Sequence, residues 1–278
     1  MTGNGGPKPL LQQCIPMPTP ASPPIALTIA GSDSGGGAGI QADLKTFHAR
    51  GVHGLSAITA ITSQNTCGVS AVHAVPLMHI RSQVAALFDD FPIAAVKTGM
   101  LGSTAITRLI AREMAARKPA WLVVDPVMIA TSGARLLDED AIGALVDELI
   151  PLADILTPNL PEAEALLGHP IKTAAQFHAA GEALLALGAG AVLLKGGHGD
   201  ARIVVDRFYD ARGVMELRHP RLKLEGHGTG CTLAAAIAAE LAKGQSPRSA
   251  VRRAVAYVHR ALLRGYRPGG GSAHVLRH

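Results

Sequence analysis

The sequence predicts one α/β domain with a mainly parallel central sheet and helices on both faces. From residue 25 onward, short apolar runs alternate with longer segments of helical periodicity. Strands that are almost continuously apolar are typical of a parallel sheet covered on both sides. Apolar residues make up 48% of the chain, and no stretch between 25 and 266 has the composition of an interdomain linker. A single domain with a large core follows.

The two ends of the chain are expected to lie outside this domain. Residues 1–24 are rich in Pro and Gly and lack the charged start and unbroken apolar segment of a secretion signal. We interpret them as a disordered leader. The domain itself is expected to span residues 25–266, and residues 267–278 are expected to form a flexible C-terminal tail.

The expected strands are short, and most of them end at a glycine or a polar cluster. In chain order they are Ile25–Ala30, Leu55–Thr62, a strand through Val96, Trp121–Val124, Ile155–Leu156 and Ala191–Lys195. Two later segments, Arg202–Tyr209 and Val214–Arg218, indicate a hairpin around residues 210–213.

Helical segments fill the intervals between these strands. The expected helices are Ile40–Arg50, His79–Phe91, Thr104–Arg117, Glu139–Leu149, Leu160–Leu167, Ala174–Leu187, Thr232–Ala242 and Pro247–Leu263. Strands that alternate with helices in this way are connected as parallel neighbours in one sheet.

Polar and glycine-rich clusters follow the carboxyl ends of most expected strands. They are 31–39, Gln64, 99–100, Asp125, Asn159 with Glu162, and 195–198. In open α/β sheets, ligands bind at the edge where the strands end. The sequence therefore predicts one site that gathers these clusters.

Composition excludes several other classes of protein. Aromatic residues make up 3% of the chain and Lys and Arg are dispersed, which argues against a nucleic-acid-binding surface. No apolar run approaches the roughly 18 residues that a membrane span needs. The three cysteines are far apart in the sequence, and they indicate a reduced, cytoplasmic protein.

The stretch 226–241 (G-H-G-T-G-C-T-L-A-A-A-I-A-A-E-L) joins a glycine-rich turn to an alanine-rich helix. The first backbone N–H groups of a helix have no intrahelical acceptor, and the helix dipole favours an anion beside them. Gly228 and Gly230 allow a ligand to approach the backbone closely. We interpret this turn as the place where a phosphoryl group is transferred, with an ordinary loop before a core helix as the alternative.

The sequence gives less support to three other kinds of site: a P-loop, a dinucleotide site and a cysteine hydrolase. The chain has no G-x-x-x-x-G-K-[ST] sequence, so it contains no standard P-loop. Residues 37–42 match G-x-G-x-x-A, but a dinucleotide site also needs an acidic residue about 20 positions later, and none occurs between Asp43 and Asp89. A cysteine hydrolase using Cys231 with His227 or His198 is conceivable but is not supported by spacing.

Seven motifs carry a resemblance to a known family. The run A-G-S-D-S-G-G-G-A-G-I-Q-A-D-L-K-T-F (30–47) resembles the start of the bacterial hydroxymethylpyrimidine/phosphomethylpyrimidine kinases of thiamine biosynthesis. In the family's order there follow T-S-Q-N-T (62–66), K-T-G-M-L (97–101), V-D-P-V-M (124–128), T-P-N-L-P-E-A (157–163), K-G-G-H (195–198) and H-G-T-G-C-T-L (227–233).

This resemblance implies a ribokinase-like fold, ATP and Mg²⁺ as cofactors and a homodimer as the assembly. The implied activity is phosphorylation of the hydroxymethyl group of 4-amino-5-hydroxymethyl-2-methylpyrimidine, followed by phosphorylation of the resulting monophosphate. A pyridoxal or pyridoxine kinase of the same fold is the alternative enzyme. Some relatives with that activity use a lid cysteine, and this chain has no Cys between residues 68 and 230. A non-catalytic pyrimidine sensor is the remaining alternative.

Several site residues follow from matching the family's motifs. Cys231 resembles the family's base, and the helix N-terminus is expected to lower its pKa. The backbone of Gly228, Thr229 and Gly230 is expected to surround the moving phosphoryl group. The residues implied to line the pyrimidine pocket are Gln64, Gly31, Asp43, Met100 and Val127.

The remaining roles concern ATP and its metal. Lys195, Asn159 and Thr229 are expected to contact ATP, and Glu162 and Asp125 are expected to hold Mg²⁺. The N-x-x-E spacing of Asn159 and Glu162 is also that of a helix-capping pair, and both roles can coexist.

Two loops depart from the family's pattern. In the first, Ser34 and Gly35 stand where Pro and Ser are usual. In the lid loop, which usually reads A-K-S-G-D, this chain has A-T-S-G-A at residues 130–134. The missing lysine and acid bear on loop closure and on the second phosphorylation.

Overall fold

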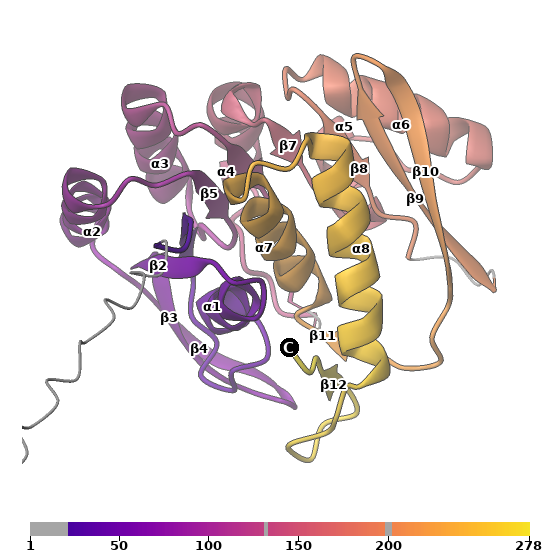
Figure 1. The fold of residues 1–278 in the computed structure, drawn as a ribbon, viewed down its shortest axis with the longest axis horizontal. Helices are drawn as coiled ribbons and strands as arrows, with labels where there is room; N and C mark the ends of the chain where they lie inside the picture. Colours follow the sequence, from indigo (N-terminus) through magenta and orange to yellow (C-terminus); the bar gives the residue numbers. More distant parts are fainter. Residues whose placement is uncertain (1–21, 131–132, 198–201) are drawn as a thin grey trace, which may run out of the picture.

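An eight-stranded sheet runs through the computed structural model, which describes residues 22–130, 133–197 and 202–278 (Figure 1). The strands lie in the order β10-β9-β8-β7-β6-β5-β1-β2. Within this sheet, β2, β1, β5, β6, β7 and β8 run parallel to one another. Strand β9 is antiparallel to β8, and β10 is antiparallel to β9. Their bounds are β1 (Ile25–Ala30), β2 (His53–Ile58), β5 (Ala95–Thr98), β6 (Leu122–Val124), β7 (Ile155–Leu156), β8 (Val192–Leu194), β9 (Ile203–Asp210) and β10 (Gly213–Pro220).

Helices cover both faces of this sheet, as the sequence predicts. One layer consists of α1 (Gly39–Ala49), α7 (Thr229–Ala242) and α8 (Pro247–Leu263). The other consists of α2 (Leu77–Asp90), α3 (Thr104–Arg117), α4 (Ala141–Ala144), α5 (Leu160–Leu167) and α6 (Ala174–Ala186). In Figure 1, α7 and α8 lie in front of the strands and α3 to α6 lie behind them. The predicted α/β architecture is confirmed.

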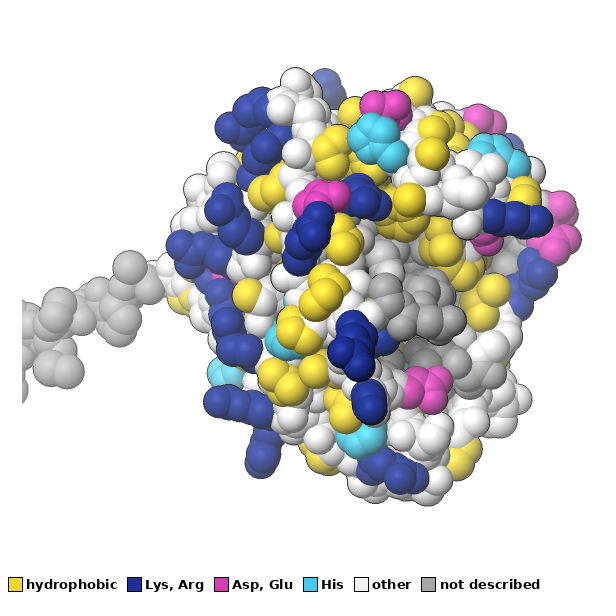
Figure 2. Space-filling view, turned by 90° about the vertical axis from the view of Figure 1, so that its right-hand side faces the viewer, with side chains coloured by type: hydrophobic (Ala, Val, Ile, Leu, Met, Phe, Trp, Pro, Cys, Tyr) yellow, Lys and Arg dark blue, Asp and Glu magenta, His cyan; other side chains and the backbone are white. Residues whose placement is uncertain are grey.

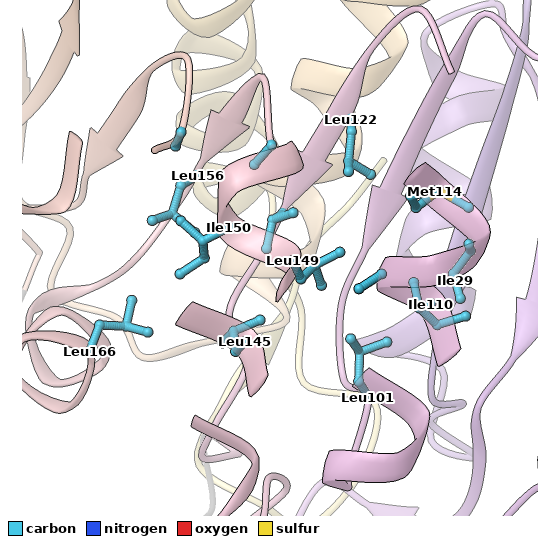
Figure 3. Close-up of a cluster of buried hydrophobic side chains, with 14 of the residues drawn as sticks. Ile29, Leu101, Ile110, Met114, Leu122, Leu145, Leu149, Ile150, Leu156 and Leu166 are labelled. Carbon is cyan, nitrogen blue, oxygen red and sulfur yellow. The ribbon is translucent and has the colours of Figure 1, made fainter. Parts of the chain in front are cut away.

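The core is divided in two by the alternation of side chains along each strand. Leu27 and Ile29 of β1 belong to the cluster under α2 to α6, whereas Ala26 belongs to the cluster under α7 and α8. Figure 3 shows the first cluster, in which Ile110 and Met114 of α3 lie close to Ile29. Because helices cover both faces, a ligand can reach the sheet at the edge where the strands end.

The predicted strand Leu55–Thr62 is wrong in one respect, because it is two strands in different sheets. β2 ends at Ile58, and β3 (Ala60–Asn65) pairs with β4 (Gly68–Ala74) in a separate two-stranded sheet. The backbone N–H of Thr59 donates to Ala30 while its carbonyl accepts from Val75, so this buried residue bridges the two sheets. Gln64 therefore lies on a hairpin beside the main sheet.

The predicted helix Glu139–Leu149 also differs. A short α4 is followed by a π-helical turn, η1 (Leu145–Leu149), and by a 3₁₀ turn, η2 (Ile150–Leu152). Pro151 has no N–H to donate, so the helical hydrogen-bond pattern cannot continue through it. The helix before β7 is consequently shorter and less regular than its periodicity indicates.

The flexible tail predicted for residues 267–278 is also corrected. Strand β12 (His274–Val275) pairs in parallel with β11 (Gly226–His227), which leads directly into α7. Val275 and Leu276 are 4% and 2% exposed, so burial of two large apolar side chains holds this segment in place. The predicted leader lies almost wholly outside the described residues.

On the face shown in Figure 2, Lys and Arg side chains occur together with acidic and apolar ones. None of the helices in the described ranges is both long and apolar enough to cross a membrane.

Candidate active site

The carboxyl ends of β1, β5, β6, β7 and β8 meet at one edge of the sheet and open into a cavity of about 600 Å³. The N-terminus of α7 and the β3–β4 hairpin contribute the remaining walls. Of the residues singled out in the sequence, those that line the cavity are Gly31, Gln64, Met100, Asp125, Val127, Asn159, Glu162, Lys195, Gly228, Thr229, Gly230 and Cys231.

Helix α7 begins at the floor of this cavity, three residues earlier than predicted. Gly228 is its cap and has a φ of 79°, a left-handed conformation that suits glycine. A Cβ placed on Gly228 would lie 1.9 Å from the carbonyl oxygen of Gly37, so the turn packs backbone against backbone on the first loop. The initial N–H groups of this 14-residue helix have its dipole behind them, an arrangement that suits an anion.

A cluster of three charged side chains faces the start of α7. Lys195 Nζ lies 3.4 Å from Asp125 Oδ1 and 3.8 Å from Glu162 Oε2. A Cβ on Gly230 would lie 3.4 Å from Lys195 Nζ, which places this ammonium group beside the helix N-terminus. Burial alone would lower the pKa of Lys195, but Asp125 and Glu162 hold it above its usual value, so the side chain is a permanent cation.

Glu162 belongs to this cluster and also to the start of α5. Its carboxylate accepts from the backbone N–H of Asn159, and the Asn159 side chain accepts from the backbone N–H of Glu162, which completes a capping box. Burial raises the pKa of Glu162 to about 7, Lys195 opposes this shift, and Asp125 adds to it. The capping role that the spacing predicts is confirmed.

The residues proposed for Mg²⁺ present one open ligand position. Oδ2 of Asp125 is buried and has no hydrogen-bond partner within the described ranges, while Oδ1 accepts from Thr157. Within those ranges, no group of three or more His, Cys, Asp or Glu side chains could hold a metal by itself. One or two carboxylates plus phosphate oxygens and waters are the usual set for Mg²⁺, so these residues fit a metal that arrives with a nucleotide.

The environment of Cys231 contradicts one prediction. Burial raises the pKa of the Cys231 thiol to about 11, although the helix N-terminus was expected to lower it. The positive charge of Lys97 acts in the opposite direction, and Asp43 and Asp125 add to the increase. Desolvation of the thiolate in this partly closed site therefore outweighs the helix dipole and the nearby cation.

Asp43 does not line the cavity, contrary to expectation. Its side chain is fully buried, accepts a hydrogen bond from Thr28 at 2.6 Å and pairs with Lys97 at 2.8 Å. Lys97 is also fully buried and lies between Asp43 and the cavity, which it lines. The sequence offered one signal for this residue, a lysine inside an otherwise buried strand.

Sequence reasoning missed the pairing of two further residues, Asp33 and His227, although His227 was considered as a partner of Cys231. Asp33, in the loop after β1, accepts from the backbone N–H groups of Gly35, Gly37 and Ala38, and one of its oxygens lies 2.9 Å from Nε2 of His227. His227 directly precedes the cap of α7 and lies next to Gln64. The pair therefore joins the first loop, the β3–β4 hairpin and the start of α7.

Comparison with known proteins identifies the family of the chain. The family model described as phosphomethylpyrimidine kinase matches residues 33–276. The chain belongs to this family. A hydroxymethylpyrimidine/phosphomethylpyrimidine kinase from Haemophilus influenzae is 48% identical over 250 residues, covering 88% of this chain and 93% of that protein.

Solved structures confirm the ribokinase-like fold predicted for this phosphomethylpyrimidine kinase family member. The phosphomethylpyrimidine kinase of Clostridium difficile is 45% identical with a TM-score of 0.77, over 86% of this chain and 99% of that chain. The pyridoxal kinase of Staphylococcus aureus, solved with AMP-PCP and pyridoxal, is 34% identical with a TM-score of 0.85, over 93% and 94% of the two chains.

Proposed function

We propose that this kinase transfers the γ-phosphoryl group of ATP to the hydroxymethyl oxygen of 4-amino-5-hydroxymethyl-2-methylpyrimidine, and then phosphorylates the monophosphate to the diphosphate, in thiamine biosynthesis. In each step an oxygen–phosphorus bond forms at the acceptor, and the bond between the γ-phosphorus and the bridging oxygen breaks. ADP leaves, and the acceptor oxygen loses its proton in the first step.

The observation that carries this proposal is the shared cavity of Gln64 and the α7 N-terminus. Gln64 offers an amide oxygen and amide hydrogens, which match the amino group and ring nitrogen of an aminopyrimidine. The first N–H groups of α7 and the Lys195 ammonium offer positive charge to phosphate oxygens. Phosphoryl transfer requires mainly this kind of positioning and charge neutralisation.

The other cavity-lining residues complete the proposed pyrimidine pocket. Met100 and Val127 supply apolar walls, and Gly31 approaches closely, since a Cβ there would lie 2.8 Å from the Met100 sulfur. Cys231 is the proposed proton acceptor, acting as a thiolate. Because the transition state is loose, the proton leaves late, and a thiolate that is scarce at neutral pH can still accept it.

ATP is proposed to enter from a second cavity of about 250 Å³ that adjoins the first. The two cavities share Lys195, Thr229 and Gly230, and apolar side chains such as Leu233 and Val255 line the second. Asp125 and Glu162, with Asn159 beside them, would hold Mg²⁺. When bound, this ion would neutralise charge on the phosphate oxygens.

The test is ADP release with a panel of acceptors: the aminopyrimidine, its monophosphate, pyridoxal and pyridoxine. We expect turnover with the two pyrimidines and a loss of at least about 100-fold in kcat for Cys231→Ala, in line with loss of a general base. A loss of only a few-fold would exclude Cys231 as the base. Binding of the pyrimidine without any ADP release would instead identify a sensor.

Pyridoxal kinase activity is the second candidate, because the TM-score to the Staphylococcus aureus pyridoxal kinase is 0.85. Turnover of pyridoxal above that of the aminopyrimidine in the same panel would favour it. A homodimer and a cytoplasmic location stay predictions, which gel filtration and cell fractionation can test.

A further inference from the structure

The Asp33–His227 pair constrains the protonation of His227. The Asp33 side chain is 2% exposed, and that of His227 is 12% exposed. Burial raises the pKa of Asp33, but hydrogen bonds from His227 and from two backbone N–H groups outweigh it and hold this pKa below its usual value. Asp33 is therefore an ionised carboxylate that can only accept. Because its oxygen lies 2.9 Å from His227 Nε2, that nitrogen must carry a hydrogen and donate it.

This donor determines which way the amide of Gln64 points. In the structure Gln64 Nε2 lies 3.3 Å from His227 Nε2, and Gln64 Oε1 lies 3.3 Å from Thr62 Oγ1. The oxygen and nitrogen of an amide are assigned from their neighbours. His227 Nε2 has one hydrogen and directs it to Asp33, so an NH₂ group beside it places two donors together. The amide is therefore better satisfied when it is turned to present Oε1 to His227.

Thr62 leads to the same orientation independently. Its hydroxyl donates to the carbonyl oxygen of Ser32 at 2.9 Å, so its remaining lone pairs can accept. The end of Gln64 that faces Thr62 is then the NH₂ group, which has hydrogens to donate. Both neighbours of the amide consequently agree, and the amide keeps one lone pair and one N–H for a ligand.

We propose that Asp33 and His227 are positioning residues that fix the Gln64 amide so that the pocket accepts a 4-aminopyrimidine and rejects its 4-oxo analogue. This inference rests on the proposed function. His227 adjoins the phosphate-binding turn, where the hydroxymethyl group must lie, and the 4-substituent is next to that group on the ring. Gln64 Oε1 on the His227 side thus meets the 4-amino hydrogens, and the NH₂ on the Thr62 side meets the ring nitrogen.

The 4-oxo analogue presents the opposite pattern, with an acceptor at position 4 and an N–H on the ring. It would place two acceptors together at Oε1 and two donors together at the NH₂ group. The amide cannot rotate to suit it unless His227 releases Oε1. Specificity at this position therefore depends on a pair of residues that need not touch the substrate.

The experiment measures kcat/KM for the 4-amino and 4-oxo forms of 5-hydroxymethyl-2-methylpyrimidine. The proteins compared are the unchanged enzyme, His227→Leu and His227→Gln. We expect His227→Leu to reduce the preference for the 4-amino form by about tenfold or more, the scale of one bidentate amide contact. In His227→Gln, the amide nitrogen takes the place of Nε2 and has two hydrogens, so the preference should stay within about threefold of the unchanged enzyme.

The control and the opposing outcomes separate this inference from the proposed function. His169→Gln alters an exposed histidine in the loop after α5 and should leave both substrates unaffected. If the unchanged enzyme phosphorylates neither pyrimidine, the proposed function is wrong. If it prefers the 4-amino form, and His227→Leu lowers both kcat/KM values by the same factor, the pair has a structural role only and the inference is overturned.

A second variant covers the case in which His227→Leu does not fold. Asp33→Ala removes the carboxylate oxygen that makes His227 Nε2 donate. We expect the same loss of preference from this variant, with a circular dichroism spectrum like that of the unchanged enzyme. An unchanged preference in folded Asp33→Ala would also overturn the inference.

Discussion

At the scale of single residues, the fold strongly changes the acidity of the Cys231 thiol. Its pKa of about 11 means that the thiolate fraction rises about tenfold for each pH unit over the range from 7 to 9. Alkylation by iodoacetamide should follow this fraction and show no plateau below pH 9. Mass spectrometry of the labelled peptide, in a Cys14→Ser, Cys67→Ser background, measures the rate.

A plateau near pH 7 or 8 in that experiment would contradict the dominance of burial. It would show that the dipole of α7 and the charge of Lys97 govern the thiol, as the sequence alone suggests. Repeating the measurement in Lys97→Met tests the effect of the Lys97 charge on the thiol. Loss of this cation should move the onset of alkylation to still higher pH.

The buried pair of Lys97 and Asp43 predicts a large effect on stability. Both side chains are 0% exposed, so Lys97→Met leaves a carboxylate buried without its cation. We expect the free energy of unfolding to fall by about 3–5 kcal/mol in urea denaturation. Adding Asp43→Leu removes the unpaired charge and should recover part of the loss.

The matched control for this pair is an ion pair on the surface. Arg108 and Glu148 lie 2.7 Å apart, with side chains 54% and 36% exposed. Arg108→Met should cost less than about 1 kcal/mol, since solvent screens such pairs. Equal losses for the two substitutions would mean that burial does not determine the strength of the Lys97–Asp43 pair.

At the scale of elements, α7 carries a glycine near each end, and the two differ in their surroundings. Gly228 and Gly244 have φ values of 79° and 81°, so alanine is strained at both, by about 1–2 kcal/mol. At Gly228 a Cβ would also meet Gly37, whereas at Gly244 nothing lies within 4 Å. We expect Gly228→Ala to lose most phosphoryl transfer and Gly244→Ala to lose stability alone.

Thermal unfolding and ADP release measured on both variants separate strain from function. Gly228→Ala should show the larger fall in melting temperature and a fall in kcat of at least about tenfold, because the N–H groups proposed to bind phosphate shift. If Gly244→Ala reduces kcat equally, the effect arises from helix stability, and the close packing of Gly228 on Gly37 does not affect catalysis.

The elements that sequence predicts best are those with local boundary signals. Helix α3 starts after Ser103, whose side chain caps it, and α5 starts after Asn159, which forms a capping box. Both helices have the predicted bounds. By contrast, the break between β2 and β3 at Thr59 depends on hydrogen bonds to two distant segments, and no local residue signals it.

The residues of the candidate site also divide into those with a local sequence signal and those without one. Cys231, Asn159 and Lys195 were predicted because each lies in a short motif at the end of a strand or the start of a helix. The pair of Asp33 and His227 was not, because 194 residues separate its members and neither spacing nor periodicity relates them. Long-range pairs of this kind require the fold itself.

At the scale of the whole molecule, the C-terminal segment packs against the loops that precede α1 and α7. Val275 pairs with His227 across β12 and β11, and its side chain would lie 3.1 Å from a Cβ placed on Gly37. Three stretches of chain that are far apart in the sequence therefore support one turn. The end of the chain consequently helps to hold the N-terminus of α7, the proposed phosphate site, in position.

This arrangement predicts that a small change at the C-terminus affects both stability and catalysis. Val275 is 4% exposed, so Val275→Ala removes two buried methyl groups and should cost about 2 kcal/mol. We also expect kcat to fall several-fold at a temperature where the variant is fully folded, because His227 loses its support. Val214→Ala, at a side chain that is 40% exposed in β10, is the control and should change neither quantity appreciably. Denaturation and ADP release measure the two effects, and a stability loss with an unchanged kcat would show that the segment packs against the site without shaping it.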